Sequence, residues 1–134
     1  MYCLIKTKSN DIWYLNEYMH RINGPATEFL DGEKWWLING KRHRENNLPA
    51  IIRKDGNEEY WINGEEYLFH ENGTKEFIDY YGRLSRVYGA AVEYPNGDKE
   101  WWIDGKRHRL DGPAVIIGDK KFWFFEGEFI KCMI

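Results

Sequence analysis

Short runs that mix apolar, often aromatic, positions with polar ones fill most of this chain, and glycine-containing turns separate them. Residues 26–30 are followed by Asp31-Gly32, and residues 33–38 are followed by Asn39-Gly40. Asp-Gly and Asn-Gly supply the positive φ angles that tight hairpin turns need. No stretch keeps an apolar spacing of 3.6 residues for three turns without glycine or proline, so no helix is predicted.

The turn glycines recur at fixed intervals. Three pairs are each eight residues apart: Gly32 and Gly40, Gly56 and Gly64, Gly97 and Gly105. Eight residues are too few for a crossover helix, so the connections are predicted to be antiparallel hairpins. The longer period, from Pro25 to Pro49, is 24 residues, and from Ala90 to Pro113 it is 23. We expect an all-β fold, an elongated single-layer antiparallel sheet of hairpins with about 23–24 residues per repeat.

One motif recurs along the chain and defines its organisation. Residues 101–114 match residues 35–50 closely, and a degenerate copy occupies residues 13–26. Terminal repeats are often atypical because they cap the array. At the N-terminus we expect strands 2–8 and 12–19 around a turn at residues 9–11. A single repeat domain, 1–134, is expected, and its predicted parts are a degenerate cap (1–24), regular repeats (25–64), an irregular repeat (65–88), regular repeats (89–128) and a closing edge strand or interface (129–134).

Composition narrows the functional classes. The 134 residues carry a formal net charge of −3, which is not the balance of a nucleic-acid-binding protein, and 17% are aromatic, which argues against disorder. No apolar run is long enough to span a membrane, and the N-terminus does not read as a signal peptide. Cys3 and Cys132 are expected to be reduced thiols, which indicates a cytoplasmic protein.

The aromatic positions suggest two rows of rings. Equivalent residues of adjacent hairpins lie about 10 Å apart. One row is predicted on one face, with the other row on the opposite face: Trp36, Trp61, Trp102 and Trp123 against Trp35, Tyr60 and Trp101. Two interpretations stay open, because the rings can form the core or can line a groove for a partner.

Arginines recur at the same phase of the motif, at Arg21, Arg44, Arg86 and Arg109. Each can pack its stem on a neighbouring ring or pair with an acidic residue of the next turn. Alternatively, they form a stripe that captures carboxylates or phosphates.

Catalytic and metal-binding chemistry finds no support in the sequence. Ser9 and Ser85 lie outside any nucleophile motif, and there is no phosphate loop and no zinc-ligand spacing. The recurring histidines (His20, His43 and His108) would lie about 10 Å apart, too far to share an ion, so we expect hydrogen bonds within turns instead. We predict a protein that is not an enzyme, with no metal and no cofactor.

The run Trp-x-Asn-Gly-Lys-Arg-His followed by a strand and Asp-Gly resembles the MORN repeat (membrane occupation and recognition nexus). The match covers residues 36–43 with Asp55-Gly56, and residues 102–108 with Gly118-Asp119 in reversed order. This chain has Arg44 and Arg109 where the family has glycine after the histidine. The variant His-Arg-x-Asp-Gly-Pro-Ala is similar to uncharacterised repeat proteins of bacteriophages and giant viruses. The resemblance spans residues 12–128 and implies an elongated single-layer sheet that binds other proteins.

These observations together predict a non-catalytic protein-binding repeat module. The resemblance implies a phage protein in the host cytoplasm that blocks a host protein such as a defence factor. The candidate partner-binding residues are Trp35, Trp36, Trp61, Trp101, Trp102, Trp123, Arg44, Arg86 and Arg109. Two alternatives remain, a protein that sequesters nucleotides or glycans and a structural spacer that self-associates. We expect neither nucleic acid nor a membrane among its partners.

Overall fold

All 134 residues are described by the computed structural model, and every regular element in it is a β-strand. The chain packs as two compact units, Met1–Tyr67 (unit 1) and Leu68–Ile134 (unit 2). The strands that begin in unit 1 are β1 (Tyr2–Lys6), β2 (Asn10–Leu15), β3 (Tyr18–Met19), β4 (Thr27–Phe29), β5 (Lys34–Trp35), β6 (Leu37–Ile38), β7 (Lys41–Arg42), β8 (Ile51–Ile52), β9 (Glu58–Ile62) and β10 (Glu65–Phe69). Those of unit 2 are β11 (Lys75–Phe77), β12 (Val92–Glu93), β13 (Lys99–Glu100), β14 (Trp102–Ile103), β15 (Lys106–Arg107), β16 (Val115–Ile117), β17 (Lys120–Phe125) and β18 (Glu128–Met133).

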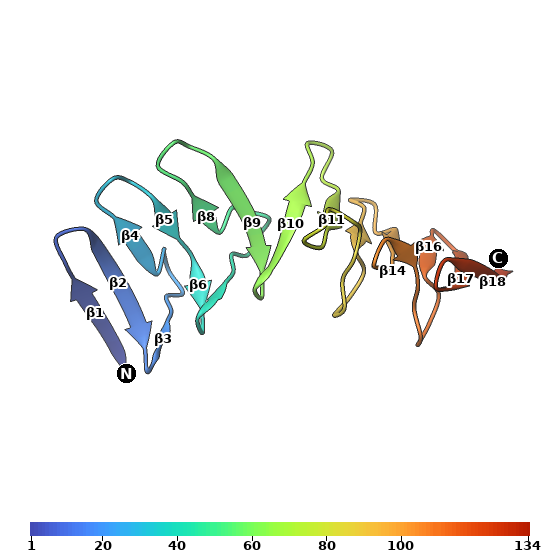
Figure 1. The fold of residues 1–134 in the computed structure, drawn as a ribbon, viewed down its shortest axis with the longest axis horizontal. Helices are drawn as coiled ribbons and strands as arrows, with labels where there is room; N and C mark the ends of the chain where they lie inside the picture. Colours follow the sequence, from blue (N-terminus) through green and yellow to red (C-terminus); the bar gives the residue numbers. More distant parts are fainter. The chain divides into compact units, whose positions relative to one another are not determined.

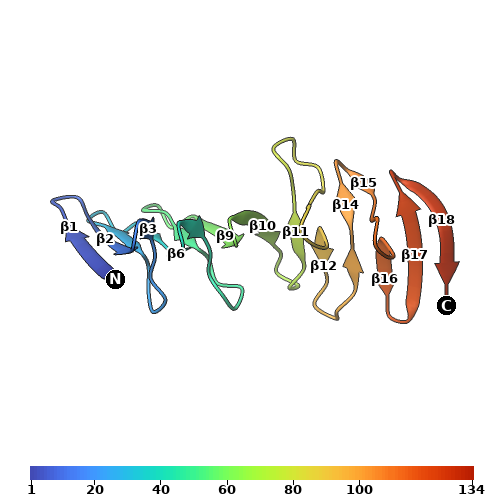
Figure 2. The ribbon, with the colours of Figure 1, turned by 90° about the horizontal axis from the view of Figure 1, so that it is seen from below.

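Each unit is a layer of antiparallel strands. In unit 1 the neighbouring strands follow the order β1-β2-β4-β5-β8-β9-β10, while β3 adds to β2 and β6 pairs with β7 (Figure 1). In unit 2 the order is β11-β12-β13-β16-β17-β18, and β14 pairs with β15 (Figure 2). The predicted all-β fold of repeated antiparallel hairpins is confirmed within both units.

Each repeat is organised around an aromatic residue at which the strand changes its hydrogen-bonding partner. Trp36 lies between β5 and β6, its N–H donates to the Ala50 carbonyl (2.7 Å), and its carbonyl accepts from the His43 N–H (3.1 Å). Before Trp36 the chain pairs with β4 and β8, and after it the chain forms the β6–β7 hairpin. Trp101 holds the same position between β13 and β14, with Ala114 as its acceptor (2.7 Å).

Small residues form the centre of each repeat. Four fully buried alanines each accept a hydrogen bond from the backbone N–H of an aromatic residue: Ala26, Ala50, Ala91 and Ala114. Larger buried side chains, among them Ile51, Tyr67 and Phe77, lie on the strands around them. A one-layer sheet has no second layer to cover it, so the core is a series of small clusters between adjacent repeats.

The N-terminal strands differ from their predicted bounds. Residues 12–19 do not form one strand, because Asn16 adopts a positive φ of 56° and a turn separates β2 from β3. The first turn also starts earlier than predicted, because the Thr7 N–H donates to the Asn10 carbonyl (2.8 Å) and the Thr7 hydroxyl bonds to Asn10 Oδ1 (2.7 Å). Asparagine tolerates the left-handed conformation, so the missing glycine did not prevent the turn.

Histidines connect each repeat to the hairpin of the next. His20 Nδ1 accepts from the Asn39 N–H (2.9 Å), and His43 Nδ1 accepts from the Asn63 N–H (2.9 Å). In unit 2 His108 Nδ1 accepts from the Glu126 N–H (3.0 Å). The repeated histidines are hydrogen-bonded as predicted, but their partners lie in the turn of the next hairpin and not in their own turn. In the irregular repeat, Ser85 Oγ performs the same task for the Asp104 N–H (3.1 Å).

Substitution of His108 tests this connection. We expect His108→Ala to lower the free energy of unfolding by about 0.5–1.5 kcal/mol, because the exposed hydrogen bond from the Glu126 N–H is lost. His108→Ser should recover part of the loss, since Ser85 shows that a hydroxyl can serve at this position. Urea unfolding followed by circular dichroism measures both changes. Equal losses for His108→Ala and for His70→Ala, whose histidine lies outside the repeat phase, would contradict the assignment.

Candidate binding grooves

An arginine stacked on an aromatic ring holds the loop at one end of each repeat. The guanidinium carbon of Arg44 lies 3.8 Å from the centre of the Trp36 ring, and Arg44 Nη1 donates to the Pro49 carbonyl (3.1 Å). Arg109 lies 3.8 Å from the Trp101 ring centre and donates to the Pro113 carbonyl (3.0 Å). The same arrangement recurs with Arg21 on Trp13 and Arg86 on Phe77. We call this unit of ring, guanidinium and loop carbonyl the arginine clamp.

A glycine makes room for the guanidinium in three of the four clamps. A Cβ at Gly112 would lie 2.9 Å from Arg109 Cζ, and one at Gly24 would lie 3.0 Å from Arg21 Cζ. In the Gly-Pro-Ala motif, the glycine allows the guanidinium to approach closely, the proline carbonyl accepts its hydrogen bond, and the alanine is the buried small residue. The Arg44 loop lacks this glycine and is one residue longer, and Asn46 and Asn47 adopt positive φ angles there (63° and 57°).

The clamps use the arginines that the sequence analysis proposed as candidates for partner binding. Burial lowers the pKa of the Arg44 guanidinium, although Glu58 acts in the opposite direction. The Arg86 side chain is only 14% exposed and lies 3.5 Å from Glu93. These contacts support the packing interpretation of Arg44, Arg86 and Arg109.

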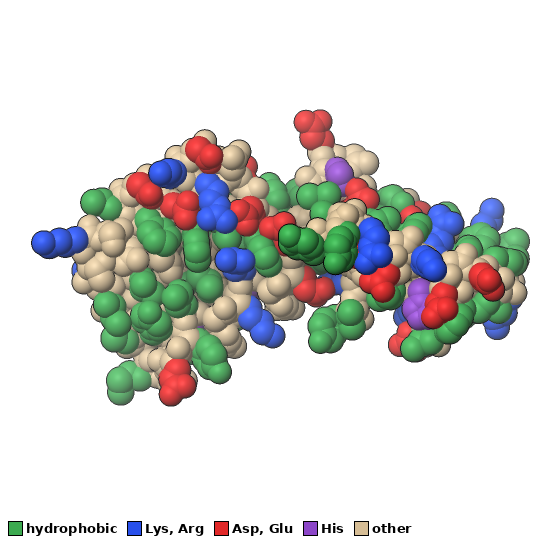
Figure 3. Space-filling model, viewed as in Figure 1, with side chains coloured by type: hydrophobic (Ala, Val, Ile, Leu, Met, Phe, Trp, Pro, Cys, Tyr) green, Lys and Arg blue, Asp and Glu red, His purple; other side chains and the backbone are tan.

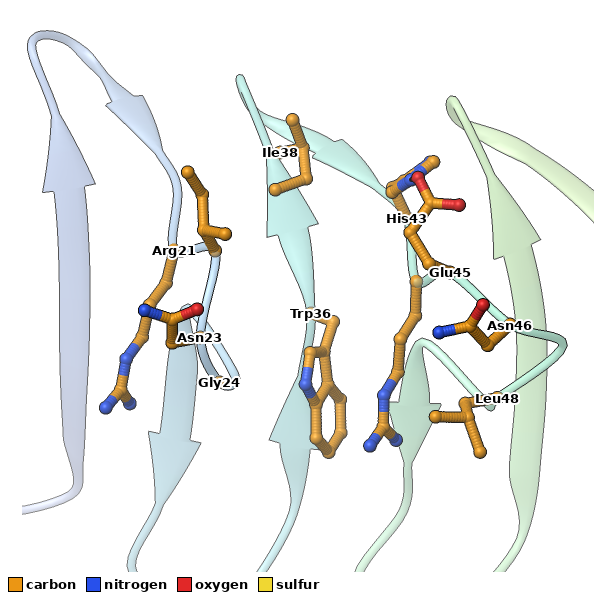
Figure 4. Close-up of a pocket in the computed structure, with 11 residues that line it drawn as sticks. Arg21, Asn23, Gly24, Trp36, Ile38, His43, Glu45, Asn46 and Leu48 are labelled. Atoms are coloured by element: carbon orange, nitrogen blue, oxygen red, sulfur yellow. The ribbon is translucent and has the colours of Figure 1, made fainter.

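Two neighbouring clamps in unit 1 enclose a groove of about 500 Å³. Its floor is formed by Trp36 and Ile38, which lie on the same face of the strand. One wall is the loop from Arg21 to Gly24, and the other is the loop from His43 to Leu48 (Figure 4). The rim exposes two apolar residues, Ile22 (70%) and Leu48 (44%), beside the polar residues Asn23, Glu45 and Asn46.

Unit 2 contains the equivalent groove, with a volume of about 770 Å³. Ten lining positions correspond at a constant offset of 65 residues, so that Trp36 corresponds to Trp101, Ile38 to Ile103 and Arg44 to Arg109. Its exposed apolar rim consists of Val87 (77%), Tyr88 (85%) and Leu110 (81%). The two units thus present the same kind of concave surface twice.

The opposite face of unit 1 carries a different arrangement of rings. Trp35 and Trp61 line a shallow groove with Leu37, and the Arg42 guanidinium lies 5.4 Å from the Trp35 ring centre and 4.7 Å from that of Trp61. Each indole donates to a nearby carboxylate, Trp35 to Glu33 (2.9 Å) and Trp61 to Glu59 (3.2 Å). Figure 3 shows hydrophobic side chains reaching the surface over the strands of this unit.

Charged groups beside these rings form an ionic network. Arg53 Nη2 lies 2.7 Å from Glu59 Oε2 and Arg53 Nη1 lies 3.5 Å from Glu33 Oε2. Burial would raise the pKa of Glu59, but hydrogen bonds from Arg53 and Trp61 hold that pKa below its usual value. Burial and the neighbouring Glu59 carboxylate raise the pKa of Glu66. The network links one arginine to two glutamates on this face.

The predicted membership of the two rows of rings is wrong. Trp36 and Trp101 are each four residues before a turn glycine, whereas Trp61 and Trp102 are three residues before one. Successive residues of a strand point to opposite faces. Trp61 therefore shares the face of Trp35, as their common contact with Arg42 shows. Trp102 lies with Phe124, and both rings contact Arg107 (5.1 and 5.4 Å).

The candidate residues consequently fall into separate groups. Trp36 and Arg44 line the groove of unit 1, and Trp101, Arg86 and Arg109 line the groove of unit 2. Trp35 and Trp61 lie on the opposite face of unit 1. Trp102 contacts Arg107, and Trp123 is covered by Lys131 Nζ at 4.7 Å. All six candidate tryptophans are half-buried.

The apolar rim residues were not predicted from the sequence. Ile22, Leu48, Val87 and Leu110 follow the clamp arginines by one to four residues. The 65-residue offset that relates His43 to His108 also relates Ile22 to Val87 and could have identified that pair. It places Leu48 on Pro113 and Leu110 on Glu45, so these two leucines carry no such signal.

No cluster of three or more histidine, cysteine, aspartate or glutamate side chains is arranged to hold a metal ion. None of the elements is a helix that could cross a bilayer. Comparisons with known proteins found no matching family model, no similar curated protein and no similar solved structure.

Proposed function

We propose that this chain is a non-catalytic repeat module that binds another protein through its two equivalent grooves. The observation that carries the proposal is the duplicated groove, in which an apolar floor lies between loops that expose apolar side chains. Exposed apolar surface of this kind is typical of interaction sites, and aromatic residues supply much of the energy of such contacts.

The clamp explains how the loops can serve as rigid walls. Each loop is fixed at both ends. At its start the arginine is stacked on its ring, and at its end the alanine carbonyl accepts a hydrogen bond from the backbone N–H of the aromatic residue. A wall that is already ordered loses little conformational freedom on binding. The rim side chains are then available to contact the partner.

Sequestering of a nucleotide or glycan between tryptophan and arginine is less well supported. Arg44 and Arg109 are already stacked on Trp36 and Trp101 and donate to loop carbonyls, so these groups are occupied. The resemblance to bacteriophage and giant-virus repeat proteins suggests a host protein as the partner.

Variants of the groove rims test the proposal. We expect one protein that combines four substitutions in the rims to lose capture of the partner, with a Kd for the complex raised at least about tenfold. The substitutions are Ile22→Ser, Leu48→Ser, Val87→Ser and Leu110→Ser. The matched control combines Leu30→Ser with Ile117→Ser, which removes exposed apolar residues outside the grooves.

Affinity capture with quantitative mass spectrometry identifies the partner, and titration calorimetry with the purified partner gives the Kd. Circular dichroism confirms that both variants are folded. Undiminished binding by the rim variant, or equal loss in the control, would exclude the grooves as the binding surface.

A further inference from the structure

β18 has an unpaired edge that exposes apolar side chains. In unit 2 it pairs with β17 and with no other strand of the chain (Figure 2). All six of its residues are exposed, with 58% exposure for both Phe129 and Ile130. Backbone N–H and C=O groups along such an edge can accept another strand.

One extra residue in β18 determines which of its side chains share a face. Glu128 lies opposite Phe125, and Lys131 lies opposite Trp123, because the register shifts by one residue between the two pairs. Phe125 and Trp123 are two positions apart and point to the same face, as do directly paired residues. Glu128 and Lys131 therefore share one face. In a regular strand, residues three positions apart would lie on opposite faces.

We propose that β18 pairs with β18 of a second copy of this chain, antiparallel and about a twofold axis perpendicular to the sheet. In the matching register Glu128 lies opposite Lys131 of the second copy, and Phe129 lies opposite Ile130 of the second copy. The axis repeats both pairs, so the contact contains two ion pairs around an apolar centre. Such an axis places the same face of both copies on one side of the joined sheet. Because the extra residue puts Glu128 and Lys131 on one face, the Glu128 carboxylate of one copy can contact the Lys131 ammonium of the other.

The charges favour a second copy over an arbitrary strand. A lysine on an edge strand discourages pairing, because an approaching strand must accommodate its charge. In an antiparallel pair of two Glu-Phe-Ile-Lys segments, each glutamate lies opposite a lysine, so a second copy brings a carboxylate opposite Lys131. Twofold contacts use one surface patch on both copies in this way.

The equivalent strand of unit 1 lacks this arrangement. β10 follows β9 as β18 follows β17, and Glu66 faces Trp61 where Phe129 faces Phe124. β18 therefore carries an apolar residue where its counterpart carries a charged one.

Charge reversal on the full chain tests the contact by sedimentation equilibrium across a wide concentration range. The unaltered chain is expected to form dimers. Glu128→Lys and Lys131→Glu, each alone, should weaken the dimer by about tenfold or more, because each replaces two attractive pairs by two repulsive ones. Lys54→Glu, in an exposed turn of unit 1, changes the net charge as Lys131→Glu does and should leave the dimer intact.

Mixing the two single variants gives the sharpest test. A copy with Glu128→Lys presents two lysines and a copy with Lys131→Glu presents two glutamates, so the mixture should dimerise more tightly than either variant alone. The double variant with both changes should dimerise by itself. A monomeric unaltered chain at every concentration, or no recovery in the mixture, overturns the proposal.

Discussion

Trp101→Ala is expected to lower the free energy of unfolding by about 3 kcal/mol, towards the lower end of the range for large aromatic residues because the ring is half-buried. The ring supports the Arg109 guanidinium at 3.8 Å, and Arg109 in turn holds the Pro113 carbonyl. Without the ring, the arginine loses its platform and the loop loses a fixed end. Urea unfolding followed by far-ultraviolet circular dichroism gives the change.

A double-mutant cycle separates the clamp from simple loss of apolar surface. Trp101→Ala, Arg109→Ala and the combined variant should show a coupling energy of about 1–2 kcal/mol, since stacking and the loop hydrogen bond depend on both residues. Additive losses would mean that the ring and the guanidinium stabilise the unit independently, and the arginine clamp would then not be a structural unit.

The second large effect is expected at Ala114. Ala114→Leu should lower the free energy of unfolding by about 2–3 kcal/mol, because this fully buried residue leaves no space for a longer side chain. Displacement of the backbone there would also break the hydrogen bond from the Trp101 N–H. The measurement is again urea unfolding.

Leu110→Ala serves as the matched control for Ala114→Leu in the same loop. Leu110 is 81% exposed, so its truncation should change stability by no more than about 0.5 kcal/mol. If Ala114→Leu were equally harmless, the loop would have to be free to move away from the ring, contrary to a loop fixed at both ends.

The turns were the most predictable part of the fold. Gly40 and Gly105 adopt φ angles of 77° and 78°, and the residues before them, Asn39 and Asp104, are also in the left-handed region. Local backbone preference is enough to identify such turns. The turn at Asn16-Glu17 was missed because it lacks glycine.

The faces of the sheet were harder to assign than the turns. Alignment of the two Trp-Trp pairs places Trp35 on Trp101, whereas alignment of the turn glycines places Trp36 on Trp101. A shift of one residue moves every side chain to the other face. Turn geometry fixes the register of a hairpin, so the glycine alignment is the correct one.

The sequence indicated that the repeated arginines could pack on neighbouring rings, but it did not indicate the full clamp. The bond from Arg109 to the Pro113 carbonyl depends on the path of the loop between them, which no periodicity describes. The grooves depend on two loops from adjacent repeats, so their depth follows from tertiary structure alone.

The arginine clamp separates the residues that hold each loop from those at its tip. Arg21 and Arg86 hold loops whose tips read Ile22-Asn23 and Val87-Tyr88, so different tips are tolerated on one frame. Evolution or an engineer could therefore exchange the tip residues to change specificity, repeat by repeat, while the backbone that presents them stays the same.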